Sequence, residues 1–296
     1  RRMLDLMGDD IDGVVIATPD HAHSHPARLA MKMGKHVYLE KPLAHTIGEV
    51  HQLIEESKKQ DVVTQMGNQG HSTHDTALAR DWILDGALGE VSEAWGSLGA
   101  GVGIEAYHEV PDVGAIPSSL HYQLWLNRVP YEPYRPKFHP NDWRGWCHFG
   151  AGNVGDECCH MLDVMYYALE PQVHGATVEV DVSDTWPVEE SYPHDQTITY
   201  HFPSSRSGSG FRLRLFVGRD APRPAALEEG RSVPGGGMVL QGDEGTMMYG
   251  HWGSDPQLLP QERMQEVGRP PEKSPRLPDG QDHWTSWVNA IRGETR

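Results

Sequence analysis

The sequence predicts an α/β fold followed by an α+β fold, that is, a partial parallel sheet and then a mostly antiparallel open sheet. Two observations predict the first part: short apolar runs separated by single helix lengths, and polar residues directly after each run. A third observation predicts the antiparallel sheet: segments beyond residue 170 alternate apolar and polar residues, as in a sheet with one packed face. The length of 296 residues favours two domains.

The first 70 residues alternate strands and helices. The expected elements are a strand at 13–17, a helix at 24–33, a strand at 36–39, a helix after Thr46 and a strand at 61–66. Gly34 is suited to end the first helix in a left-handed conformation, and Thr46 with Glu49 forms a capping box for the second. Strands joined through single helices pair in parallel, and ligands collect at the carboxyl ends of such strands.

The rest of the chain has a different pattern. We expect helices at 75–84, 156–168 and 284–291, strands at 91–98, 178–182 and 211–217, and a hairpin of 238–241 with 246–249. The stretch 117–146 has no clear period, and 256–278 is typical of a linker. These patterns predict a first domain at 1–70, a second at 71–281 and a C-terminal amphipathic helix at 282–296.

Composition and charge exclude several classes of function. A net charge of −17 argues against binding to nucleic acid or to an anionic membrane, because both need basic patches. Three cysteines, two of them adjacent, argue against a disulfide framework, and no apolar run is long enough to span a bilayer. The chain starts without Met close to a strand, so we expect its beginning to be missing. The compartment, cytoplasm or periplasm, stays open.

Lys41 is the first candidate for chemistry. The segment Glu40-Lys41-Pro42 comes directly after an apolar strand, at the sheet edge where ligands bind. Pro42 fixes the local backbone. The competing interpretation is a surface lysine at a strand end, the commonest fate of lysines.

Asp156 and His160 are the second candidates. Their i, i+4 spacing places a carboxylate and an imidazole on one helix face, and such a His works as a general base near neutral pH. Asp163, one turn further, is expected to orient the other ring nitrogen of His160. The competing interpretation is a surface Asp/His pair, but three glycines just before Asp156 allow a ligand to approach the helix start closely.

Two further patterns are rejected. Residues 150–155 satisfy G-x-G-x-x-G, but no strand precedes them, and the dinucleotide-binding motif requires one. Asp20 with His21, His23 and His25 resembles a set of metal ligands, yet the histidines open a helix, where their side chains diverge. The adjacent cysteines at 158 and 159 are poorly spaced for one tetrahedral zinc ion. We therefore expect no metal site.

Three stretches carry a resemblance to a known family. They are 17–23 (A-T-P-D-H-A-H), 34–44 (G-K-H-V-Y-L-E-K-P-L-A) and 150–163 (G-A-G-N-V-G-D-E-C-C-H-M-L-D). In order and spacing, the chain resembles the glucose–fructose oxidoreductase / inositol dehydrogenase / rhizopine-catabolism (Gfo/Idh/MocA) family along nearly its whole length. The segment 125–146 is similar to a bacterial subgroup that often carries export signals.

The resemblance implies a Rossmann domain that binds NAD or NADP, followed by a substrate domain whose open sheet forms a dimer or tetramer interface. In the family's pattern, Lys41 contacts the substrate hydroxyl and the nicotinamide, Asp156 holds the substrate, and His160 is the acid/base. The full set that it implies is Thr18, Pro19, His23, Glu40, Lys41 and Asn68 for the cofactor, and Trp143, Arg144, Asp156 and Asp163 for the substrate.

The chain departs from the family pattern at two places. We expect the family's first strand and Gly-rich turn to lie outside this sequence, so the resemblance does not imply that this chain binds the cofactor or is active alone. The residue that selects NAD or NADP belongs to the same region. Cys158 stands where the family has Gly in D-x-G-x-H, which affects the geometry of the helix start.

The resulting hypothesis is an NAD(P)-dependent oxidoreductase that moves a hydride between nicotinamide and a secondary alcohol of a sugar, glycoside or cyclitol. Two alternatives on the same fold stay open: NAD-assisted cleavage of a glycoside, and a non-catalytic protein that binds a sugar or nucleotide. A metal-dependent hydrolase is the last rival. The sequence does not identify the sugar.

Overall fold

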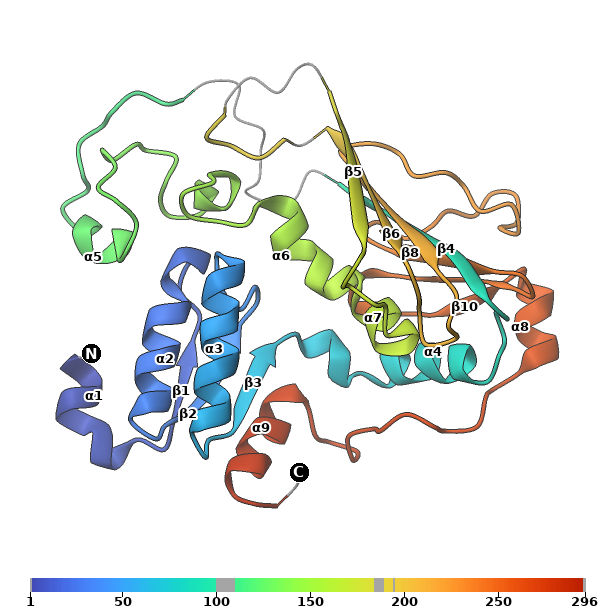
Figure 1. The fold of residues 1–296 in the computed structure, drawn as a ribbon, viewed down its shortest axis with the longest axis horizontal. Coiled ribbons are helices and arrows are strands. Elements are labelled where there is room, and N and C mark those ends of the chain that lie inside the picture. Colours follow the sequence, from blue (N-terminus) through green and yellow to red (C-terminus); the bar gives the residue numbers. More distant parts are fainter. Residues whose placement is uncertain (1, 100–109, 184–188, 194, 295–296) are drawn as a thin grey trace.

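The computed structural model describes residues 2–99, 110–183, 189–193 and 195–294, and they form two sheets with their helices (Figure 1). The first sheet consists of β1 (Gly13–Ile16), β2 (His36–Glu40) and β3 (Thr64–Gly67), in that order. Both strand pairs are parallel. The predicted parallel sheet is therefore confirmed, with each strand within three residues of its expected bounds.

Helices cover both faces of this sheet. Helices α2 (Ser24–Lys32) and α3 (Ile47–Lys59) pack on one face, where Val37 and Leu39 of β2 join the apolar core of the first domain. The predicted capping box at Thr46 and Glu49 is present at the start of α3. Tyr38 points to the opposite face. Burial on both faces explains why β2 is a continuous apolar run instead of an alternating one.

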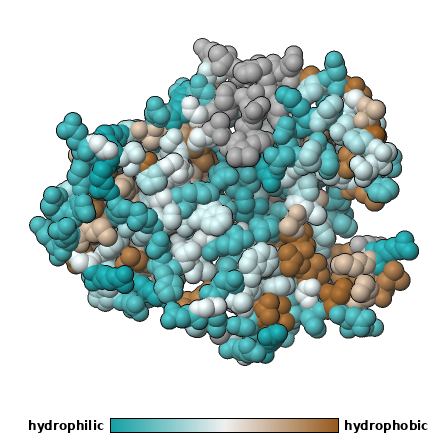
Figure 2. Space-filling view, turned by 180° about the vertical axis from the view of Figure 1, so that it is seen from behind, coloured by the Kyte–Doolittle hydropathy of each residue, from teal (hydrophilic) through white to brown (hydrophobic). Residues whose placement is uncertain are grey.

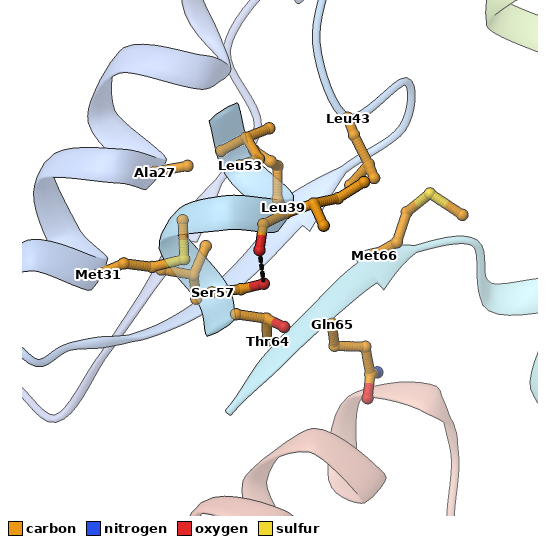
Figure 3. Close-up of a pocket in the computed structure, with 11 residues that line it drawn as sticks. Ala27, Met31, Leu39, Leu43, Leu53, Ser57, Thr64, Gln65 and Met66 are labelled. Carbon is orange, nitrogen blue, oxygen red and sulfur yellow. Dashed lines mark hydrogen bonds between the residues drawn. The ribbon is translucent and has the colours of Figure 1, made fainter. Parts of the chain in front are cut away.

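A small apolar pocket lies inside this layer, between α2, α3 and the sheet (Figure 3). Its volume is about 170 Å³, and Met31, Leu39, Leu53 and Met66 are among the side chains around it. The hydrogen bond drawn there, from Ser57 Oγ to a backbone carbonyl of α3, is internal to the helix. The lining of the pocket is mostly apolar, and its polar side chains, Ser57, Thr64 and Gln65, are not titratable, so the pocket is not a candidate for catalysis.

The C-terminal helix α9 (His283–Ile291) returns to the first domain and covers its second face (Figure 1). Its Trp284 stacks on Tyr38 with ring centroids 3.8 Å apart. Gly13 of β1 lies so close to Trp287 that an added Cβ would come within 2.9 Å of that ring. The boundaries predicted at residues 70 and 281 remain a prediction.

Among the described residues, β1 pairs with β2 only, so its other edge is open. Helix α1 (Arg2–Met7) lies next to α2 at the same end of the molecule (Figure 1), and Met3, Leu6, Met7 and Val15 are each at least half exposed. Figure 2 shows apolar side chains gathered on this side of the molecule. An exposed apolar patch of this kind is typical of a contact surface.

The second sheet has seven strands in the order β10-β9-β8-β4-β7-β6-β5. Their bounds are Val91–Leu98 (β4), Thr177–Val182 (β5), Gln196–Phe202 (β6), Phe211–Val217 (β7), Met238–Gly242 (β8), Thr246–Tyr249 (β9) and Gln257–Leu259 (β10). All neighbouring pairs are antiparallel except β4 with β7. The predicted mostly antiparallel sheet is confirmed, and β6 is an addition to the prediction.

Helices α4 (His74–Leu84), α6 (Gly152–Met161) and α7 (Asp163–Leu169) contribute to the core on one face of this sheet. Helix α5 (Tyr122–Leu126) and the 3₁₀ helix η4 (Asp142–Gly145) lie in the stretch without a clear period. The single helix predicted at 156–168 is wrong, because the chain leaves α6 at Leu162 and starts a second helix. The linker predicted at 256–278 is also wrong, since β10 and α8 (Gln261–Val267) lie within it. Within the described ranges, no helix combines the length and apolar character needed to cross a bilayer.

Trp82 of α4 is expected to contribute strongly to stability. It is 1% exposed in the core of the second domain, and its Nε1 donates to the Gly268 carbonyl at 2.9 Å. We expect Trp82→Ala to lower the free energy of unfolding by about 3–5 kcal/mol, measured by urea unfolding with circular dichroism. Leu124→Ala is the control, because Leu124 is 78% exposed and its loss should cost less than about 0.5 kcal/mol. Equal losses in the two variants would contradict this packing.

Candidate active site

A polar cavity lies where β1 and β2 end and where α6 begins. Its volume is about 520 Å³. The strand ends contribute 17–20, His23, Glu40 and Lys41, and the second domain contributes Trp125, 139–141, Trp143, Arg144 and Asp156. The carboxyl ends of parallel strands are the usual ligand site of α/β sheets, and this cavity adds several convergent polar groups.

Lys41 and Asp156 form an ion pair across this cavity. Lys41 Nζ donates to Asp156 Oδ1 at 2.6 Å and to the Asp156 backbone carbonyl at 2.9 Å. Burial lowers the pKa of Lys41, but the hydrogen bond and charge of Asp156 outweigh it, so the pKa is raised overall. The ammonium is therefore charged at neutral pH. The structure brings these two residues together from positions 115 apart in the sequence.

Asp156 also faces a second cation. Arg144 Nε lies 3.4 Å from Asp156 Oδ2, and the guanidinium sits over the Trp143 ring at 4.4 Å from its centroid. Arg144 Nη1 donates to the Asn141 side-chain oxygen at 2.9 Å, which fixes its orientation. Asp156 is thus held between Lys41 and Arg144, one cation at each carboxylate oxygen.

His160 lies one turn beyond Asp156 on α6 and is hydrogen-bonded to Asn68. The Asn68 amide donates to the Cys159 carbonyl at 3.2 Å, so its oxygen faces His160 Nδ1 at 2.8 Å. His160 Nδ1 therefore carries the proton, and Nε2 is left as a proton acceptor. Burial, with the charges of Lys41 and His251, lowers the pKa of His160 to about 4, so the ring is neutral at ordinary pH.

The expectation that Asp163 orients His160 is wrong. Asp163 accepts a hydrogen bond from His71 Nδ1 at 2.9 Å, and it is not among the residues that line the cavity with Asp156. The reason is the break at Leu162, after which Asp163 starts α7 and no longer continues the face of α6. Asn68, which the sequence assigned to the cofactor, orients the ring instead. The signal for this role was its position directly after β3.

The other predicted cofactor residues lie at the strand ends. Thr18, Pro19, His23 and Glu40 line the cavity. The His23 ring nitrogens lie 2.7 Å from the Pro42 carbonyl and 2.6 Å from the Thr18 carbonyl, so this ring ties the ends of β1 and β2 together. Asn68 is not among the lining residues.

Asp20 is a residue of the cavity that sequence reasoning considered only as a metal ligand. It is 3% exposed, and its Oδ2 accepts a hydrogen bond from the Ala151 N–H at 3.0 Å. His21 beside it contacts two backbone carbonyls, those of Phe149 and Trp125. Among the described residues, no group of three or more His, Cys, Asp or Glu side chains is arranged to hold a metal ion. The signal for Asp20 was its place directly after a strand end.

The residues of this cavity fit one half of a dinucleotide. The strand ends supply a hydroxyl, a carboxylate and an ammonium group at the place where a nicotinamide and its ribose bind in such sheets. In the described part of the chain, none of the three turns after β1, β2 and β3 contains G-x-G-x-x-G. The G-x-G-x-x-G at 150–155 opens α6 and follows η4, so it does not link a strand to a helix.

Comparison with known proteins supports the resemblance. Residues 2–68 match a family model described as an oxidoreductase family with an NAD-binding Rossmann fold. Residues 106–204 match the model of the C-terminal alpha/beta domain of an oxidoreductase family. Together the two matches take in more than half of the chain.

Curated relatives include enzymes with sugar-related names. Levoglucosan dehydrogenase of Pseudarthrobacter phenanthrenivorans is 29% identical over 161 residues, which are 54% of this chain and 33% of that protein. The 1,5-anhydro-D-fructose reductase of Ensifer adhaerens is 33% identical over 88 residues, 29% of this chain and 26% of that protein. The chain thus spans a third or less of each of these relatives.

Solved structures share the fold over nearly the whole chain. A levoglucosan dehydrogenase complex with NADH and L-sorbose has a TM-score of 0.59 at 19% identity, covering 99% of this chain and 74% of that one. The WlbA dehydrogenase of Bordetella pertussis with NADH and UDP-GlcNAcA also has a TM-score of 0.59, at 17% identity, covering 100% and 72%.

The family models, the two sheets and the ion pair between the E-K-P and D-x-x-x-H segments agree with one another. The chain belongs to the Gfo/Idh/MocA family of oxidoreductases, with an NAD-binding Rossmann domain followed by a C-terminal α/β domain.

Proposed function

We propose that this protein oxidises a secondary alcohol of a sugar, glycoside or cyclitol with NAD or NADP, reversibly. The observation that carries the proposal is the Lys41–Asp156 ion pair in a polar cavity at the strand ends, with a neutral His160 one helical turn away. Relatives named for levoglucosan, 1,5-anhydro-D-fructose and myo-inositol support a sugar or cyclitol as the substrate.

The cofactor would be held by the strand ends. Thr18, Pro19 and Glu40 line the cavity and would contact the nicotinamide half, while His23 keeps the ends of β1 and β2 at a fixed separation. The nicotinamide, when bound, supplies the acceptor for the hydride that leaves the alcohol carbon. The side chains of this protein would bind the substrate, polarise its oxygen and accept the proton.

Lys41 would polarise the alcohol oxygen. An ammonium group has three N–H donors, and two of them are used by Asp156. The third is available to an oxygen in the cavity. A charged donor aimed at this oxygen stabilises the alkoxide character that develops during oxidation.

His160 would accept the hydroxyl proton at Nε2. Asn68 fixes the ring by accepting from Nδ1, and the neutral state of the ring leaves Nε2 able to act as a base. Asp156 keeps lone pairs for a neighbouring hydroxyl, although both of its oxygens face cations. Trp143 and Arg144 line the same cavity and would complete the substrate side.

We expect Asn68→Leu to lower kcat with little change in fold. The substitution removes the acceptor for His160 Nδ1, and a buried group left without its partner costs about 1–3 kcal/mol, or roughly 5- to 150-fold in rate. The pH dependence of kcat should also shift, because the ring loses its fixed tautomer. Asn289→Leu on α9, outside the cavity, is the matched control. A wild-type kcat for Asn68→Leu would contradict the orientation of His160 by Asn68.

NAD-assisted cleavage of a glycoside is the second candidate. A relative named as a glycosyl hydrolase family 109 protein, from Shewanella pealeana, is 31% identical over 86 residues and favours it. The same Lys41, Asp156 and His160 would serve both reactions. A non-catalytic binding protein would not need a charged lysine paired with a fixed carboxylate and a neutral imidazole one helical turn further on.

One assay separates these functions. The protein from its complete reading frame is incubated with NAD or NADP and with levoglucosan, myo-inositol and aryl glycosides. Sugar-dependent formation of NADH or NADPH is the expected result. Release of the aryl group without net reduction of the nucleotide would favour cleavage, and the absence of both reactions would overturn the enzyme proposal.

We also propose a homo-oligomer that uses the second sheet. Val178 and Val180 of the edge strand β5 are each more than half exposed, and apolar side chains on a sheet edge are suited to a contact with another subunit. Sedimentation of the protein as a dimer or tetramer is the expected outcome, and a monomer at all concentrations would contradict it.

A further inference from the structure

Asp20 is a carboxyl of the cavity to which the proposed reaction assigns no role. It starts the 3₁₀ helix η2 (Asp20–Ala22), directly after the end of β1, and lines the same cavity as Lys41 and Asp156. Its Oδ2 accepts a hydrogen bond from the Ala151 N–H at 3.0 Å. In the described ranges, no cation lies within ion-pair distance of Asp20, and its carboxyl forms no second hydrogen bond.

The other two carboxylates of the cavity already have roles in the proposed function. Asp156 has Lys41 at one oxygen and Arg144 at the other. Glu40 accepts a hydrogen bond from the Gln69 amide at 3.2 Å. Among the described residues, Glu40 Oε2 has no hydrogen-bond partner, like one oxygen of Asp20, but the proposed function assigns Glu40 to the cofactor. Asp20 is therefore the carboxyl of the cavity that has a free oxygen and no assigned role.

The surroundings of Asp20 allow it to carry a proton near neutral pH. Burial makes the largest contribution and raises the pKa of Asp20, and the charge of Asp156 on α6 raises it further. The hydrogen bond from Ala151 and the cations Arg144 and Lys41 lower it. The resulting pKa is about 7. Tyr192 also faces it, because the charge of Asp20 helps to raise the pKa of Tyr192. A protonated carboxyl can donate to the oxygen of an alcohol as well as accept from its O–H, whereas an ionised carboxylate can only accept, so the contact with a hydroxyl should change near pH 7.

We propose that Asp20 determines specificity by holding a second hydroxyl of the substrate through its free oxygen. The inference rests on the proposed function and narrows its substrate class. Lys41 and His160 need only one hydroxyl, whereas Asp20 adds a contact that only a polyhydroxylated substrate can make. A simple secondary alcohol should therefore bind much more weakly than a sugar or cyclitol.

Two substitutions separate this role from a structural one. Asp20→Asn keeps an oxygen for the Ala151 N–H and an N–H₂ donor for the cavity, but it does not titrate. Asp20→Ala removes both contacts. Asp75→Asn is the matched control, because Asp75 also accepts a backbone N–H, that of Asp255 at 2.9 Å, outside the cavity.

The test is the pH dependence of kcat and of KM for the best sugar and for 2-propanol. We expect the wild-type KM for the sugar to change near pH 7, Asp20→Asn to hold one KM at all pH values, and Asp20→Ala to raise KM at least tenfold with kcat changed less. KM for 2-propanol should not respond to either substitution. Asp75→Asn should behave as wild type throughout.

The results that would overturn the role of Asp20 differ from the result that would overturn the proposed function. A sugar KM of Asp20→Ala equal to that of the wild type, or a shift near pH 7 that persists in Asp20→Asn, would overturn the role of Asp20 and leave the proposed function intact. If Asp20→Ala fails to fold, Asp20→Asn alone decides through its pH profile. If the wild type turns over no sugar at all, the proposed function fails and the inference fails with it.

Discussion

Lys41→Ala is expected to lower kcat/KM for sugar oxidation by roughly 10²–10³-fold, the usual cost of losing one charge-stabilising donor. Lys41 Nζ holds Asp156 at two points and keeps one N–H for the alcohol oxygen. Its loss therefore removes both the polarising charge and the partner of Asp156. The measurement is steady-state formation of reduced nucleotide by the purified variant.

The control for this prediction is Lys273→Ala. Lys273 Nζ donates to Asp85 Oδ1 at 2.7 Å and to the Leu84 carbonyl at 3.0 Å, which is nearly the same pattern of contacts away from the cavity. We expect wild-type turnover and an unfolding temperature within a few degrees of wild type for this control. Unchanged turnover in Lys41→Ala would contradict the assignment of the site.

His160→Gln is expected to lower kcat by roughly 10²–10⁴-fold, the range of a lost general base. A glutamine can still contact Asn68, so the fold around α6 should persist. In the wild type, the base works in its neutral form. Because the pKa of His160 is about 4, kcat should stay constant from pH 7 to pH 5. It should fall only as the pH drops through 4 and the ring becomes protonated.

The control for His160 is His71→Gln. His71 pairs with Asp163 outside the cavity, and this hydrogen bond, which outweighs burial, raises its pKa. We expect its loss to leave kcat unchanged. A wild-type kcat that falls between pH 7 and 6, with a profile that His160→Gln does not alter, would show that another group is the base.

The sequence predicts the first domain well because each signal there is local. The apolar runs, Gly34 and the Thr46 capping box act within a few residues, and the structure has each of them at the expected place. Lys41 could be singled out for the same reason, since a strand end is a local feature. Asp156 could be singled out from its spacing to His160, but the ion pair with Lys41 was not predicted, because it joins residues far apart in the chain.

Other predictions failed, mainly where contacts between distant parts of the chain determine the structure. The apolar positions of 156–168 continue one helical face, so nothing local marks the break at Leu162 that redirects Asp163 to His71. Asp20 shows the same limit, because its raised pKa comes from burial and from Asp156 across the cavity. Strand β6 is a different case: in Q-T-I-T-Y-H-F the apolar Ile198, Tyr200 and Phe202 alternate with polar residues, so a local signal was present and the prediction missed it.

The most direct test of the central claim follows the hydrogen that leaves the alcohol carbon. The wild-type protein is incubated with NAD or NADP and the most active sugar, labelled with deuterium on every carbon, and the nucleotide is analysed by mass spectrometry. We predict reduced nucleotide that carries one deuterium from the sugar, with Lys41→Ala forming almost none. Turnover of the sugar with no deuterium in the nucleotide would contradict direct oxidation at this cavity.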